Sequence, residues 1–243
     1  MMNIWSMTDT GLVRKENQDA YEVKKAFGHM ICVVCDGMGG SAGGKLASRI
    51  AVDTFTAEME KRLSPEAKPD RLREVSVVAV ALANRAVREA ARSSEEYQNM
   101  GTTLVSAVSF DGGVVIANVG DSRAYHITKE RIVQITRDHS LVERMVERGD
   151  ITAEEARRHP NRNLITRALG PDVDPECDCY TCQLLPGDYL LLCTDGLVNT
   201  VTDQEIRAEV LRPDTESCMD RLLAISKSRG ASDNLTVVLA RKL

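Results

Sequence analysis

The sequence predicts a protein of the α+β class, because helical and strand periodicities occupy separate stretches of the chain. Residues 44–90 carry apolar side chains at helical spacing, whereas residues 102–135 alternate with a period of two. No regular succession of strand, helix and strand connects them. The chain has 243 residues, of which 43% are hydrophobic, so we expect a large core and a single domain over residues 1–243.

Two long amphipathic helices are expected first. One covers about residues 44–63, where apolar positions recur at helical spacing until Ser64-Pro65 breaks the pattern. The second carries the same spacing over residues 72–90. Near the C-terminus, two shorter helices are expected at about 203–211 and 214–227.

Strands are expected between and around these helices. Residues rich in β-formers predict strands at 102–109, 114–119, 122–127 and 131–135, and the turn residues between them predict one antiparallel meander. Apolar runs at 31–35, 189–194 and 235–239 predict three more strands.

Residues 141–163 differ from the rest, with many alternating charges and few large apolar side chains. Thr152 and Glu155 have the spacing of a capping box, and His159-Pro160 ends the short helix that this box begins. We expect a solvated helical hairpin, which is compatible with a mobile flap beside a site.

Composition excludes several classes of function. A net charge of −5 leaves no basic excess to neutralise nucleic-acid phosphates. The N-terminus lacks a signal-peptide pattern, and no run approaches the ~18 apolar residues that span a bilayer. Seven cysteines in such a chain indicate reduced thiols and a cytoplasmic protein without membrane insertion.

Aspartates lie where predicted strands meet turns. Asp36-Gly37 follows the strand at 31–35, Asp195-Gly196 follows the strand at 189–194, and Asp233 precedes the last strand. A neighbouring glycine lets the backbone approach a ligand, so we expect a hard-cation site that closes on folding. Oxygen ligands favour magnesium or manganese over zinc, and the four histidines are not spaced as a zinc pair.

Two other kinds of site fit the sequence less well than a hard-cation site. Gly37-x-Gly39-x-x-Ala42 resembles a dinucleotide fingerprint, but Asp36 would repel a pyrophosphate and a second helix follows where a strand is required. Cys177, Cys179 and Cys182 cluster without a histidine, so a structural role is favoured over a thiolate metal site.

Eight short motifs cover nearly the whole chain in order: TDTGLVRKENQD at 8–19, VCDGMGG at 34–40, MGTT at 100–103, NVGDSR at 118–123, TRDHS at 136–140, LITRALG at 164–170, CTDGL at 193–197 and SDNLT at 232–236. In these motifs the chain resembles the metal-dependent type 2C protein phosphatases in their compact bacterial form. The resemblance implies a central antiparallel β-sandwich flanked by helix pairs on both faces, with the small helical flap at 141–163.

The resemblance also implies a ligand set. Asp36 would bridge two magnesium or manganese ions, with the Gly37 carbonyl on the first ion and Asp195 and Asp233 on the second. Asp121 would help to hold a third, weaker ion, although a simple turn-forming role for it stays open.

The resemblance also implies roles for residues outside the ligand set. Asp19 would hold a metal-bound water, and Arg14 would grip the substrate phosphate, which its planar fork suits. Asp138 and His139 are expected to anchor the base of the flap by hydrogen bonds.

The implied activity is hydrolysis of phosphoserine and phosphothreonine in proteins by attack of a metal-activated water. Its partners would be phosphorylated proteins, including a bacterial Ser/Thr kinase and its targets, and the protein would be a monomer. A phosphatase dedicated to one substrate, such as an anti-sigma-factor antagonist, and a non-catalytic phosphoprotein-binding regulatory module are the alternatives. The intact set of aspartates disfavours the module.

The chain departs from the family pattern at three positions. Met38 replaces a histidine that eukaryotic relatives carry as a proposed general acid, so no side chain is assigned as the acid. Ser41 and Lys45 replace a histidine and a glutamate of bacterial relatives and are expected to alter the rim of the site. Cys193, two residues before Asp195, raises the hypothesis of oxidative inactivation.

Overall fold

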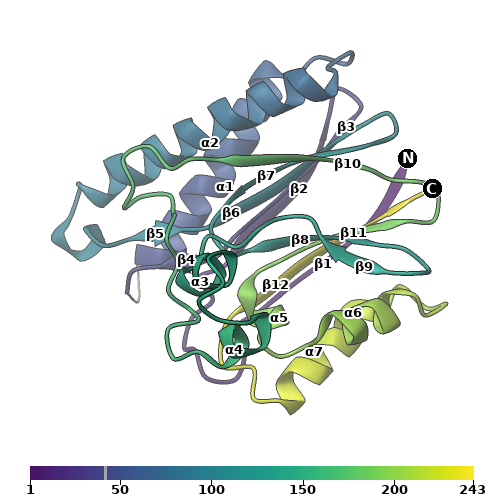
Figure 1. Ribbon diagram of the computed structural model, residues 1–243. Coiled ribbons are helices and arrows are strands. Elements are labelled where there is room, and N and C mark those ends of the chain that lie inside the picture. The colour runs from purple at the N-terminus through teal and green to yellow at the C-terminus, as the bar shows by residue number, and fades with distance from the viewer. Residues whose placement is uncertain (41–42) are drawn as a thin grey trace.

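Two five-stranded antiparallel sheets pack face to face in the computed structural model, which describes residues 1–40 and 43–243 (Figure 1). The first sheet has the order β1-β12-β11-β8-β9, and its strands are β1 (Met2–Asp9), β8 (Arg123–Ile127), β9 (Ile132–Gln134), β11 (Tyr189–Cys193) and β12 (Leu235–Lys242). The second has the order β10-β7-β6-β3-β2, and its strands are β2 (Ala20–Ala26), β3 (His29–Cys35), β6 (Leu104–Phe110), β7 (Gly113–Val119) and β10 (Asp178–Gln183). A small third sheet pairs β4 (Gly37–Met38) with β5 (Gly101–Thr102).

Helices cover both outer faces of the sandwich, as Figure 1 shows. The long helices α1 (Gly43–Arg62) and α2 (Pro69–Ala91) lie on the second sheet, with the short 3-10 turn η1 (Glu95–Tyr97) after them. The helices α5 (Asp195–Val198), α6 (Asp203–Val210) and α7 (Cys218–Ser228) lie on the first sheet. The predicted α+β class and the implied β-sandwich with flanking helix pairs are therefore confirmed.

Alternation along β3 shows how the sequence builds these layers. Ile31, Val33 and Cys35 pack against α1 and α2, whereas Cys32 and Val34 face the other sheet. Because both faces of the strand are covered, all its residues are buried and the run is continuously apolar. Among the described residues, no helix is both long and apolar enough to cross a membrane.

Most predicted helices and strands lie within a few residues of their expected bounds, but the predicted meander was wrong. The hairpin of β6 and β7 lies in the second sheet, with its turn at Asp111-Gly112, whereas β8 and β9 pair in the first. The chain crosses between the sheets at Gly120-Asp121. Alternation identifies strands but not their partners, which here are β10 for β7 and β11 for β8, more than 50 residues later in the sequence. The last helix also starts later than expected, at Cys218.

The predicted helical hairpin at 141–163 is confirmed as α3 (Leu141–Glu147) and α4 (Ala153–Arg158). The capping box between Thr152 and Glu155 is present. At the base of this flap, Asp138 pairs with Arg123 at 2.6 Å, and the His139 main-chain N–H donates to the Gly120 carbonyl at 3.0 Å. The predicted anchoring by Asp138 and His139 is therefore confirmed.

Candidate metal centre

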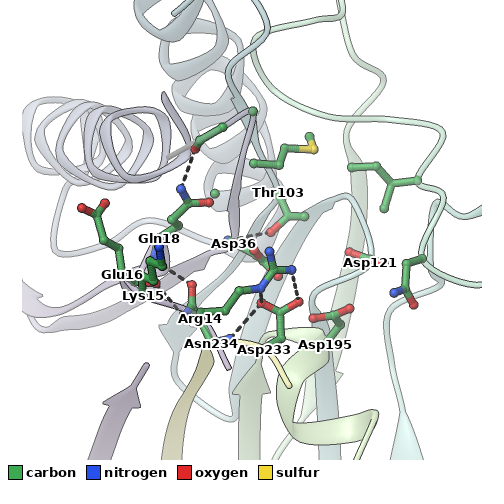
Figure 2. Close-up of a pocket in the computed structure, with 16 residues that line it drawn as sticks. Arg14, Lys15, Glu16, Gln18, Asp36, Thr103, Asp121, Asp195, Asp233 and Asn234 are labelled. Carbon is green, nitrogen blue, oxygen red and sulfur yellow. Dashed lines mark hydrogen bonds and ion pairs between the residues drawn. The ribbon is translucent and has the colours of Figure 1, made fainter. Parts of the chain in front are cut away.

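A cleft of about 460 Å³ opens at one end of the sandwich, where loops from both sheets meet (Figure 2). Its walls contain Arg14, Asp36, Asp121, Asp195 and Asp233, which come from loops or element ends far apart in the sequence. The fold thus brings together the residues that the motifs singled out. Asn163 and Ile165, at the end of the flap, also line the cleft.

Asp36 follows β3 directly, and its main chain is held by Thr102, the last residue of β5, and by Thr103, which precedes β6. Its N–H donates to Thr103 Oγ1 at 2.9 Å, and its carbonyl accepts from Thr102 Oγ1 and from the Thr103 N–H, each at 2.9 Å. Both polar groups of the Asp36 main chain are satisfied by these neighbours. The carboxylate is therefore held by the backbone and stays available to the cleft.

In both Asp19 and Asp195, one carboxylate oxygen accepts hydrogen bonds and the other has no partner in the described part of the chain. Asp19 Oδ2 accepts from Thr194 Oγ1 at 2.9 Å and Thr236 Oγ1 at 2.7 Å, and Asp195 Oδ2 accepts from Asn199 Nδ2 at 2.9 Å. The Oδ1 atoms of both aspartates are buried with no hydrogen-bond partner within residues 1–40 and 43–243. Buried acceptors without partners are rare in folded proteins, and these two lie among other carboxylates, which makes them candidates for contact with a cation or a water.

Arg14 and Asp233 pair with each other at the mouth of the cleft. Arg14 Nε and Nη2 donate to Asp233 Oδ1 and Oδ2, both at 2.8 Å (Figure 2). Asp233 Oδ1 also accepts from the Asn234 N–H at 2.9 Å. The Arg14 side chain is 55% exposed, so its charge lies where a ligand can reach it. The guanidinium that was expected to grip phosphate therefore engages an expected metal ligand in this structure.

The carboxylates strongly perturb one another. Burial and then the charges of Asp19 and Asp195 raise the pKa of Asp36 well above its usual value. Burial also raises the pKa of Asp19 to about 7, against the lowering effect of its hydrogen bonds from Thr236 and Thr194, and the charges of Asp195 and Asp233 add smaller increases. The pKa of Asp121 rises to about 8, through burial and then the charge of Asp195. A cluster of this kind is ionised at neutral pH only if cations compensate it.

The donor set fits magnesium or manganese. It contains only carboxylate and carbonyl oxygens, and one of them, the buried Asp195 Oδ1, has no hydrogen-bond partner among the described residues. In the described part of the chain, no three histidine, cysteine, aspartate or glutamate side chains are arranged as the ligands of one ion. Magnesium needs only one or two carboxylates because it keeps several waters. The three-carboxylate set implied for the second ion, Asp36, Asp195 and Asp233, would require Asp233 to leave Arg14.

The glycines beside these aspartates lie in close contact with neighbouring backbone. A Cβ on Gly37 would lie 2.1 Å from the Gly44 carbonyl oxygen, and one on Gly196 would lie 1.9 Å from that of Asn234. These contacts are protein backbone, so a side chain at either glycine would collide with a neighbouring loop, and the expected approach of the backbone to a ligand stays a prediction. The glycines let neighbouring loops close around the aspartates.

Sequence reasoning missed the residues that position the site. Asn234 accepts from the Gln18 N–H at 2.8 Å and donates to the Thr10 and Glu16 carbonyls, which fixes the loop that carries Arg14. Thr236, which holds Asp19, is a buried polar residue in the apolar strand β12. A lone buried threonine of this kind needs a partner, and this was the available signal.

The departures from the family pattern are placed as follows. Met38 lines the cleft, as expected from its position after Asp36. Lys45 is exposed on α1, and its expected effect on the rim of the site stays a prediction. Ser41, like Ala42, lies outside the described residues. Cys193 is fully buried and burial raises its pKa, which disfavours the reactive thiolate and argues against the oxidation hypothesis.

Comparisons with known proteins find matches over nearly the whole chain. A family model described as protein phosphatase 2C matches residues 13–240. The serine/threonine phosphatase stp of Listeria monocytogenes is 36% identical over 241 residues, which span 97% of this chain and 94% of that protein. Protein phosphatase PhpP of Streptococcus pneumoniae is 35% identical, with 98% and 96% covered. The crystal structure of a serine/threonine phosphatase from Staphylococcus aureus has a TM-score of 0.94 at 37% identity, covering 100% of this chain and 96% of that one.

Proposed function

The chain belongs to the protein phosphatase 2C family as a serine/threonine protein phosphatase of the bacterial type, and we propose that it removes phosphate from phosphoserine and phosphothreonine at the aspartate-lined cleft. The observation that carries this proposal is the meeting of Asp36, Asp121, Asp195 and Asp233 in one cleft with Arg14 at its mouth. Such a cluster suits cations and, through them, a phosphate dianion.

We propose that two magnesium or manganese ions bind here, and that Asp121 contributes to a third. Asp36 and the Gly37 carbonyl, with Asp195 and Asp233, would hold the first two. When bound, the ions would activate a water for attack on phosphorus and neutralise the charge that develops. The two threonines on Asp19 Oδ2 fix this carboxylate, so that its free Oδ1 can accept a proton or orient a water.

Arg14 would bind the substrate phosphate through the two N–H groups that now contact Asp233. A phosphate that binds Arg14 in place of Asp233 would free the Asp233 carboxylate to turn toward the cleft. Met38 lines the cleft where a proton donor would be useful, but a thioether has no proton to give. No side chain is therefore proposed as the general acid.

The proposed partners are phosphorylated proteins, among them a cognate Ser/Thr kinase and its substrates. The names of the relatives support the phosphoprotein substrates, since each is a protein or serine/threonine phosphatase. All seven cysteines are free, which supports the proposed cytoplasmic location, and a monomer remains our proposal for the oligomeric state.

Phosphate release from a phosphothreonine peptide tests the proposed activity. Turnover is expected with manganese or magnesium and should be lost with EDTA, because the carboxylates alone cannot hold the phosphate. Calorimetric manganese binding, measured on the same protein, separates an inactive enzyme from a metal-free one. A folded protein that binds manganese but releases no phosphate would overturn the proposal and favour the regulatory module.

Rates on intact phosphoproteins and on peptides separate a broad enzyme from a dedicated one. A dedicated phosphatase should favour one intact protein strongly over the peptides cut from it. A broad enzyme should show similar rates across the panel.

Deletion of α4 from the flap is expected to lower rates on phosphoproteins more than rates on p-nitrophenyl phosphate. The groove between the flap and the segment 198–204 is lined by Arg157, Arg158 and Arg162 and shares Asp121 and Asp195 with the aspartate cleft, so these arginines are placed to contact a protein chain that extends beyond the phosphate. Steady-state rates on both substrates provide the measurement. Equal losses on both would show that the flap only supports the fold.

A further inference from the structure

The cysteine cluster that the phosphatase reaction leaves unused divides between the two faces of β10. Cys177 and Cys179 are half-buried and pack against the core beneath α1 and α2, whereas Cys182 faces the interior of the sandwich. β10 lies at the edge of its sheet (Figure 1), and its ladder begins only at Asp178. Cys177 therefore lies next to Cys179 on one face and is not held by strand pairing.

The two thiols contact each other and are chemically unequal. A hydrogen bond from Cys177 and the nearby charge of Arg73 lower the pKa of Cys179, although its partial burial opposes them. The same hydrogen bond, together with burial, raises the pKa of Cys177. Arg73 comes from α2 and donates to the Cys179 carbonyl at 3.2 Å and to Thr181 Oγ1 at 3.3 Å, which keeps its charge at this point. Cys179 is the nucleophile of the pair and Cys177 is placed to resolve it.

We propose that Cys177 and Cys179 form a peroxide-responsive dithiol that closes reversibly to a disulfide and loosens the base of the flap. The Cys179 thiolate attacks one oxygen of hydrogen peroxide, breaks the O–O bond and becomes a sulfenic acid, and the hydroxide released takes up a proton to give water. The Cys177 sulfur then attacks the Cys179 sulfur, and the thiol proton of Cys177 leaves with the sulfenic hydroxyl as a second water. One peroxide is reduced to two waters, and two thiols are oxidised to one disulfide.

Closure of this ring would strain the strand at Asp178. Residues two apart on an extended strand are separated by roughly 6.6 Å, at the upper end of the Cα separations that disulfides adopt, which are most often about 5.5–6 Å. The start of β10 would have to tighten, which the unpaired Cys177 permits. Strained disulfides of this kind are easily reduced again, as a reversible device requires.

Asp178 connects this strain to the flap and the cleft. Its Oδ1 accepts from Arg167 Nη1 at 2.9 Å, and its Oδ2 lies 3.2 Å from His139 Nε2. The Gly120 N–H donates to His139 Nδ1 at 3.0 Å, which assigns the proton of this ring to Nε2 and makes it a donor to Asp178. Gly120 precedes Asp121, so a displaced Asp178 would disturb both the flap base and one wall of the cleft.

Peptide mass analysis after peroxide treatment of the full chain tests the site. Chymotrypsin cleavage after Leu169 and Tyr180 gives a fragment, 170–180, with Cys177 and Cys179 as its only cysteines. After alkylation, this fragment is expected unalkylated and lighter than its dithiol form by two hydrogen atoms. Cys177→Ser and Cys179→Ser should abolish this species, whereas the control Cys182→Ser should retain it. Recovery of doubly alkylated or sulfinic fragment alone, from protein that keeps its native circular dichroism, would overturn the proposal.

Limited trypsin digestion tests the coupling to the flap without any use of phosphatase activity. Cleavage at the exposed Arg157 and Arg158 is expected to be several-fold faster after peroxide and to return to its initial rate after dithiothreitol. Asp178→Asn should show the faster cleavage without peroxide, and Cys182→Ser should behave like the wild type. A disulfide that leaves the cleavage rate unchanged would overturn the coupling and leave only the dithiol site.

Discussion

Replacement of Asp36 with asparagine is expected to lower metal-dependent phosphate release by about 10³-fold or more. Asp36 is the carboxylate that all the other cleft aspartates perturb, and the ions that it would hold supply several kcal/mol of transition-state stabilisation. Each ~1.4 kcal/mol lost lowers the rate about tenfold, so a loss of ~4 kcal/mol gives this factor. Asp195→Asn is expected to act in the same direction.

Matched measurements separate a lost site from a lost fold. The control is Asp111→Asn, which changes an exposed aspartate in the β6–β7 hairpin turn and should leave activity and manganese binding unchanged. Asp36→Asn should keep its fold, because the main chain of Asp36 is clamped independently of its carboxylate. If Asp36→Asn retains most of its turnover while manganese binding is intact, the assignment of this residue is wrong.

The metal-free protein is expected to lose stability as the pH rises from about 4 to 8, which is opposite to the behaviour of most salt-bridged carboxylates. An acid whose pKa is higher in the folded than in the unfolded protein contributes stability below its unfolded pKa and loses it as the pH passes its folded pKa. The unfolded reference is 3.8, and the folded values are about 7 for Asp19 and about 8 for Asp121. Each pH unit in this window should lower the free energy of unfolding by up to ~1.4 kcal/mol per ionising group.

Bound cations should reverse this trend. Magnesium at ~100 times its Kd is expected to raise the free energy of unfolding by about 2.7 kcal/mol, because it binds the folded state preferentially. Urea unfolding between pH 5 and 8.5, in EDTA and in magnesium, provides the measurement. A metal-free protein whose stability rises toward pH 8 would contradict the clustering of ionisable aspartates in the cleft.

Asp121→Asn isolates one contribution to this pH dependence. In EDTA at pH 8 the variant should be more stable than the wild type by on the order of 2–4 kcal/mol, because a neutral side chain replaces a carboxylate that must ionise while buried. At pH 5 the difference should be clearly smaller, because that pH lies only about one unit above the unfolded pKa of 3.8, whereas pH 8 lies about four units above it. Asp111→Asn again serves as the control, with no change expected at either pH.

Local patterns in the sequence determined the helices, the strands and the capping box of α4. Helical spacing at 44–63 and strand alternation at 114–119 are short-range features, and each was found within a few residues of its expected place. The meander failed for a physical reason that applies generally. Alternation specifies which side chains share a face of a strand, but the partner strand is selected by packing between segments distant in the sequence. Local patterns therefore could not predict that the chain crosses from one sheet to the other at Gly120-Asp121.

The candidate site divides in the same way. Asp36, Asp195 and Asp233 could be singled out from the sequence because a charged side chain beside an apolar strand is chemically conspicuous. The tertiary structure alone decided that Thr194 and Thr236 hold one oxygen of Asp19, that Asn234 ties down the loop of Arg14, and that Arg14 pairs with Asp233. These are contacts across up to 219 positions in the chain, made by residue types that are common on any surface. The sequence alone specifies which side chains are available to the site. The distances between them, and hence their pKa values and partners, were decided by the packing of the two sheets against each other.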